Sequence, residues 1–138
     1  MTERPDKRAI ASWAFYDFAN TIFSMNVISL YFALWVTVDH GGEDILYSIA
    51  LSGSMLAVAI SAPVFGTISD QTGRRRFPLI LLTIISVFAT ALIGQASQLW
   101  IGLLLFVIAN YCYQSALVFY NGMLPSVARQ SNVGMISG

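Results

Sequence analysis

The chain has little charge, and charge is what a water-facing surface needs. Only 10% of its 138 residues are Asp, Glu, Lys or Arg, while 57% are hydrophobic. Soluble globular proteins carry about 25% charged residues, so the composition excludes an ordinary soluble domain. The longest charge-free runs are 18–38, 45–69 and 77–128. A helix that crosses the hydrocarbon core needs about 20 mostly apolar residues, and each run is long enough.

Other absences exclude several chemistries. A single cysteine, Cys112, cannot form an intrachain disulfide. The only histidine, His40, stands in a predicted loop, and no group of His, Cys and carboxylates has metal-site spacing. There is no phosphate-binding Gly–Lys loop and no nucleophile with its base. We therefore expect no enzyme activity, no metal and no cofactor. The arginine triplet 74–76 is too short to predict nucleic-acid binding.

The longest apolar run must fold back on itself. As one helix, residues 77–128 would be about 78 Å long, against about 30 Å for the hydrocarbon core. We place a turn at 94–98, the most polar and Gly-bearing point inside the run. The expected order is an N-terminal segment 1–12, transmembrane helices at about 13–38, 45–69, 77–95 and 99–124, and a loop 125–138. We expect that loop to lead to a fifth helix that is missing here, so that the chain is part of a longer all-α membrane protein.

The basic residues predict the orientation. They are Arg4, Lys7 and Arg8 before the first helix, Arg74–Arg76 between the second and third, and Arg129 after the fourth. Cytoplasmic loops collect Lys and Arg. We therefore predict a multi-pass integral membrane protein with a cytoplasmic N-terminus, in the plasma (inner) membrane if the source is bacterial.

Two predicted helices carry a polar face. The candidates are Asp17, Asn20, Thr21 and Ser24 in the first helix, with Tyr31 further along, and Asn110, Tyr113, Gln114 and Asn121 in the fourth, with Tyr120 between. Polar groups in lipid are costly unless they face protein or a water-filled cavity. The pattern predicts a cavity wall for a small polar solute. The alternative is that these groups only bond helices together, and that Asp17 is a boundary acid stabilised by the helix dipole.

The loop between the second and third helices has a specific composition. Gly66 and Gly73 allow a tight turn. Asp70 could pair with Arg74, four residues on, if the helix continues. The simpler interpretation is that the arginines hold the loop in the cytoplasm.

This segment resembles the loop motif of the major facilitator superfamily. Gly66, Asp70, Gly73, Arg74 and Arg75 match its pattern, and Gln71 departs from it. The resemblance implies that the loop latches a cytoplasmic gate, with Asp70 and Arg74 as the latch. The stretches Trp13–Asn20 and Phe119–Pro125 are similar to the vacuole-effluxer-type branch of the superfamily.

The resemblance implies twelve helices in two halves of six, with the solute bound between the halves. The four helices here would be the first part of one half, and their partners would be the bilayer and the missing helices. The yeast-type members that it resembles are linked to amino-acid export from the vacuole. We therefore expect a secondary transporter of a small polar solute, with amino acids as the candidate cargo. The alternatives are a non-transporting scaffold or assembly subunit, and a four-helix exporter acting as an antiparallel dimer, which the one-sided basic residues disfavour.

Overall fold

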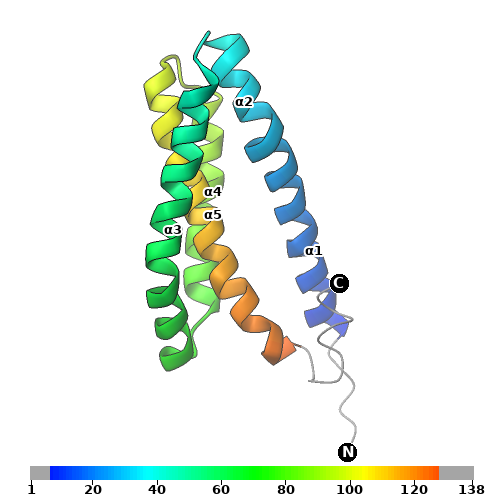
Figure 1. Cartoon of the computed structure of the whole chain (residues 1–138). Helices are drawn as coiled ribbons and strands as arrows, with labels where there is room; N and C mark the ends of the chain where they lie inside the picture. The colour runs from blue at the N-terminus through cyan, green and yellow to red at the C-terminus, as the bar shows by residue number, and fades with distance from the viewer. Residues whose placement is uncertain (1–6, 128–138) are drawn as a thin grey trace, which may run out of the picture.

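The computed structural model describes residues 7–127, and every element in that range is a helix (Figure 1). In chain order these are α1 (Lys7–Ile22), η1 (Phe23–Tyr31), α2 (Phe32–Leu34), η2 (Trp35–Asp39), α3 (Asp44–Thr72), α4 (Arg76–Ile93) and α5 (Leu99–Val127). The first four segments run on as one helical rod, Lys7–Asp39. Within the described range, four helices are long and apolar enough to cross a membrane. The predicted all-α membrane fold is confirmed.

The observed helix ends lie close to the ends of the charge-free runs, with one exception. Within the described residues the first helix already includes 7–12, which we expected to precede it, and this segment contains no Pro or Gly that would break a helix. The chain leaves α4 after Ile93 and enters α5 at Leu99, around the expected turn. Arg129 and the expected approach to a fifth helix lie outside the described residues.

Helix α5 is the central element, because it packs along α3 on one side and α4 on the other. Small buried side chains mark both contacts, with Ser54 on α3 and Ser86 on α4. The Ser86 hydroxyl donates to the carbonyl of Ala109 at 3.0 Å. Small residues allow helix backbones to approach closely in lipid, where van der Waals packing drives association.

The C-terminal end of the first helix packs against both α3 and α5. Phe32 stacks on Phe106 of α5 with ring centroids 4.0 Å apart. The Tyr47 hydroxyl of α3 donates to the carbonyl of Ile28 at 2.7 Å. Trp35 lies directly over Gly102, where a Cβ would sit 2.0 Å from an indole carbon. Toward its N-terminus the helix diverges from α3 (Figure 1).

The middle of the first helix is π-helical, which changes the predicted polar face. Within η1 the Ser29 hydroxyl donates to the carbonyl of Ser24, five residues back, at 3.0 Å. A π-helix has i→i+5 bonds, so a face extrapolated at 3.6 residues per turn drifts out of register. Tyr31, which we expected on the same face as Asp17, ends this segment and is 62% exposed.

Candidate functional site

The chemistry-bearing residues gather toward one end of the bundle. The N-terminus of α1, the α3–α4 junction and the C-terminus of α5 all lie at that end (Figure 1). The described basic residues there are Lys7, Arg8, Arg74, Arg75 and Arg76. The acidic residues Asp39, Glu43 and Asp44 lie at the opposite end, where the first helix joins α3. The described basic residues and these three acidic residues therefore lie at opposite ends of the bundle, as the sequence predicts.

Two tyrosines of α5 hold the N-terminal half of the first helix. The Tyr113 hydroxyl donates to the carbonyl of Asn20 at 3.2 Å, and the Tyr120 hydroxyl donates to the carbonyl of Trp13 at 3.0 Å. Tyr120 also stacks on the Trp13 ring, with centroids 3.8 Å apart. These side chains thus bridge α1 and α5. We call the hydrogen bonds from Tyr113 to Asn20 and from Tyr120 to Trp13 the tyrosine clasp.

A third tyrosine links α1 to α4. The hydroxyls of Tyr16 and Thr83 are 2.9 Å apart, and Thr83 itself donates to the carbonyl of Leu79 at 2.7 Å. Tyr16 therefore donates to Thr83. The Tyr16 ring tilts against Tyr120 with centroids 4.7 Å apart. The three hydroxyls of Tyr16, Tyr113 and Tyr120 are all engaged.

The predicted cavity residues divide by exposure. Asp17, Thr21 and Asn121 are exposed, Asn20, Ser24, Tyr113 and Gln114 are half-buried, and Asn110 is buried. The Thr21 hydroxyl donates to the main-chain carbonyl of Asp17 at 3.0 Å, so it does not engage the Asp17 carboxylate. The exposed and half-buried members lie on the first helix, in α1 and η1, and on α5. These are the two helices on which the sequence predicts a polar face.

Asn110 is a correction to the predicted cavity wall. It is 0% exposed, and its Nδ2 donates to the Ser54 hydroxyl at 2.7 Å. Its neighbour Tyr111 donates to the Ser61 hydroxyl at 3.0 Å. Both side chains bond α5 to α3 rather than facing the first helix. The sequence pattern could not distinguish a cavity-lining Asn from one that bonds a neighbouring helix. The same polar residues form a helix face in both cases.

The α3–α4 loop turns at Gly73. Helix α3 ends at Thr72, and Gly73 has φ of +61° with its N–H bonded to the carbonyl of Ser69 at 3.1 Å. This left-handed cap is the conformation that glycine adopts most easily. Gly66, by contrast, has open space around its Cα. Of the two predicted turn glycines, Gly73 therefore makes the turn.

The ion pair in this loop joins Asp70 to Arg75, with the two charged atoms 3.0 Å apart. The predicted Asp70–Arg74 pair was wrong. The i,i+4 relation holds only within a continuous helix, and the cap at Gly73 breaks it. Arg74 is exposed in the structure, whereas the Arg75 side chain is 24% exposed.

Arg75 also reaches α5. Its Nη1 donates to the main-chain carbonyl of Gly122. A Cβ on Gly122 would sit 3.5 Å from the Ser69 hydroxyl and 3.7 Å from Arg75 Nε, so the surfaces touch closely. We call the Asp70–Arg75–Gly122 contact the loop pin. Sequence analysis missed Gly122, although it stands inside the quoted stretch Phe119–Pro125.

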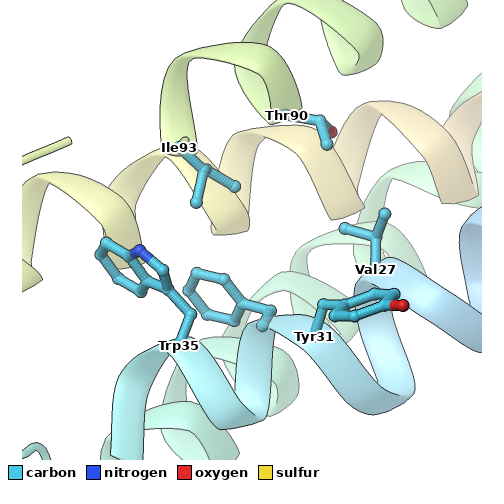
Figure 2. Close-up of a pocket in the computed structure, with 6 residues that line it drawn as sticks. Val27, Tyr31, Trp35, Thr90 and Ile93 are labelled. Atoms are coloured by element: carbon cyan, nitrogen blue, oxygen red, sulfur yellow. The ribbon is translucent and has the colours of Figure 1, made fainter. Parts of the chain in front are cut away.

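A separate cavity lies between the first helix and α4, nearer the acidic end. Its volume is about 180 Å³ (Figure 2). It is lined by Val27, Tyr31, Phe32, Trp35, Thr90 and Ile93. The Thr90 hydroxyl is engaged with the carbonyl of Ser86 at 2.8 Å. The lining is mostly apolar, so this cavity does not suit a polar solute, and sequence analysis did not predict it.

The four long apolar helices of residues 7–127 indicate a multi-pass integral membrane protein. The family model described as "Vacuole effluxer Atg22 like" matches residues 44–134. The chain belongs to this family, and the predicted resemblance is confirmed.

Two curated relatives extend the comparison. An uncharacterized protein of Aquifex aeolicus (strain VF5) is 29% identical over 141 residues, covering 100% of this chain and 36% of the relative. A Bacillus subtilis (strain 168) protein described as the uncharacterized MFS-type transporter YxiO is 28% identical over 137 residues, covering 91% of this chain and 32% of the relative. The chain thus spans about a third of the length of these relatives. No solved structure matches the chain.

Proposed function

We propose that the protein is a secondary transporter that moves a small polar solute across its membrane by alternating access. The observation that carries the proposal is the family match, which includes all of α3, α4 and α5 and the loop between α3 and α4. The MFS-type name of the Bacillus subtilis relative supports it. Because the chain spans about a third of its relatives, the rest of the transporter would come from further helices.

In this proposal the first helix and α5 form one wall of the solute pathway. Asp17 lies in α1 and Asn121 near the C-terminal end of α5, and both side chains are exposed. In transporters built from repeats, the solute lies near the bilayer midplane, and one bundle rocks against another. The loop pin would stabilise one gate state by fixing the α3–α4 loop to α5. The basic end would face the cytoplasm.

Amino acids are the cargo class we propose. The exposed and half-buried groups on this wall are one carboxylate, three amides and three hydroxyls, those of Asp17, Asn20, Thr21, Ser24, Tyr113, Gln114 and Asn121. Such groups bind neutral or zwitterionic solutes through hydrogen bonds. The scaffold alternative requires these groups to be packed dry, and the exposure of Asp17, Thr21 and Asn121 does not favour it.

Uptake into proteoliposomes tests the proposal. The protein is purified, reconstituted and preloaded with a mixture of unlabelled amino acids, and the entry of labelled amino acids, sugars and ions is followed by exchange. We expect accelerated exchange of at least one amino acid over protein-free vesicles. An intact, folded protein that exchanges none of these solutes would contradict a transport function.

A further inference from the structure

The first helix contacts α5 on both sides of its π-helical segment η1. Toward the C-terminus, Phe32 stacks on Phe106 with ring centroids 4.0 Å apart. Toward the N-terminus, the tyrosine clasp holds the main-chain carbonyls of Trp13 and Asn20. Because η1 is the segment between these two sets of contacts, any change in its winding turns one half of the helix relative to the other.

The winding of η1 is visible in its hydrogen bonds. The N–H of Phe32 is bonded to the carbonyl of Val27, five residues back. The Ser29 hydroxyl also donates five residues back, to the carbonyl of Ser24. Further along the same helix, the Thr37 hydroxyl donates four residues back, at 2.9 Å, as is usual in an α-helix. Segments with i→i+5 bonds are rare and are frequent at functional sites.

Two opposing preferences act on this segment. The buried residues Ile28, Phe32 and Val36 recur every four positions and share one core cluster with Phe106. Four residues of an α-helix overshoot a full turn by about 40°, so this row would drift about 80° around an α-helix. A π turn contains more residues and reduces the drift. Packing therefore favours the π winding, whereas the backbone alone favours the α winding.

The contacts of the N-terminal half allow it to turn. An α-helix rotated by about 100° and moved by about 1.5 Å along its axis presents the same backbone as before. After such a step, the hydroxyls of Tyr113 and Tyr120 would meet the carbonyls of neighbouring residues. Side-chain contacts do not repeat in this way. The 2.9 Å contact of Tyr16 with Thr83 and the stack of Trp13 on Tyr120 belong to the present register.

We propose that η1 is a torsional hinge, which rewinds from π to α and turns the N-terminal half of the first helix by about one residue, or about 100°. This inference rests on the proposed transport function. Each winding presents a different set of α1 side chains to the pathway, and a switch between two discrete arrangements of one element is the kind of motion that gates a transporter.

Distances within the first helix test the hinge directly. Pairs of spin labels are placed at Phe15 and Val38, which flank η1, and at Ile45 and Ile68 of α3, in the whole reconstituted protein carrying Cys112→Ala. All four labelled side chains are exposed, and both pairs are 23 residues apart, about 35 Å along an α-helix. We expect a two-peaked or broader distribution for the first pair, measured by pulsed electron resonance, because only η1 has two windings.

Two changes in η1 should shift the first distribution toward the longer distance. A π turn rises less per residue, because a hydrogen bond of the same length spans five residues instead of four. Deletion of Met25, an exposed residue, removes the additional residue and should leave a single narrow peak. Ser29→Ala removes the five-residue hydroxyl bond without shortening the chain and should enlarge the longer-distance population. Thr37→Ala, which removes a four-residue bond from the same helix, is the matched control and should change nothing.

Solute exchange then connects the hinge to transport. Deletion of Met25 should slow exchange by at least about tenfold in protein that remains folded, since a conformational step sets the rate. A wild-type distribution as narrow for the first helix as for α3, or one unchanged by both η1 variants, would overturn the hinge. Exchange as fast in the deletion variant as in the wild type would overturn its role in transport. If even the wild type exchanges nothing, the transport proposal fails, and the distances still decide the hinge.

Discussion

At the scale of single residues, neighbours in sequence have very different surroundings. Arg74 is exposed, while Arg75 bonds Asp70 and the Gly122 carbonyl. The sequence motif could identify the loop and its acid but not the arginine that pairs with it. That choice depends on how the chain leaves the left-handed turn at Gly73. Similarly, Asn110 and Asn121 look alike in sequence, and only the position of Ser54 on α3 separates a packing amide from an exposed one.

The loop pin predicts different effects for the two arginines. Arg75→Ala removes the contacts to Asp70 and to α5, whereas Arg74→Ala removes neither. Asp70 is 76% exposed, and exposed ion pairs contribute little to stability, about 0–1 kcal/mol. We therefore expect Arg75→Ala to slow solute exchange severalfold while membrane expression stays near wild type. Arg74→Ala is the control for exchange. A marked fall in expression for Arg75→Ala would assign the pin to folding, and equal exchange in both variants would show that no pin operates.

Gly102 is a residue whose importance was not visible in the sequence. A Cβ there would meet the Trp35 indole at 2.0 Å, whereas a Cβ on Gly53 meets nothing within 4 Å. Overpacking of a close contact costs about 1–3 kcal/mol, while Gly→Ala in an open helix position is favourable by up to about 1 kcal/mol. Gly102→Ala should therefore lower the melting temperature and Gly53→Ala should not. Thermal unfolding in detergent measures both, and equal melting temperatures would mean that Trp35 moves aside freely.

At the scale of the elements, helix positions were predictable and helix contacts were not. The charge-free runs and one polar turn were enough to locate the four long helices. A helix must be about 20 apolar residues long to cross the bilayer, and its backbone groups must be hydrogen-bonded within it. The π-helical segment Phe23–Tyr31 left no clear mark in the residue pattern. The central place of α5 was also not evident, since its apolar length resembles that of α3.

The tyrosine clasp predicts how firmly the N-terminal half of the first helix is held. Tyr113→Phe with Tyr120→Phe keeps the rings and removes both hydroxyl bonds, each contributing about 0.5–1.5 kcal/mol. We expect a broader distance distribution between spin labels at Ala11 and Ile68, measured by pulsed electron resonance. Tyr111→Phe, which removes an equivalent bond between α5 and α3, should leave that distribution unchanged. Identical distributions in all variants would show that ring stacking alone fixes α1.

At the scale of the whole molecule, charge and polarity are segregated. In the described part of the chain, basic residues gather at one end and apolar side chains cover much of the outside. The charge pattern was readable from sequence because loops between crossing helices alternate between the two sides of a membrane. The exposure of each polar side chain could not be predicted from the sequence. It depends on how far the first helix diverges from α3.

The most direct test of this account is the reach of water to those polar groups. Single cysteines at Thr21, Asn121, Asn110 and Ile84 are introduced into reconstituted protein carrying Cys112→Ala, and the rate of reaction with a charged, water-soluble thiol reagent is measured. We predict fast reaction at 21 and 121, slowed by transported solute. Positions 110, buried against α3, and 84, on the apolar face of α4, should react slowly. Reaction at 21 and 121 as slow as at 84 would contradict the account.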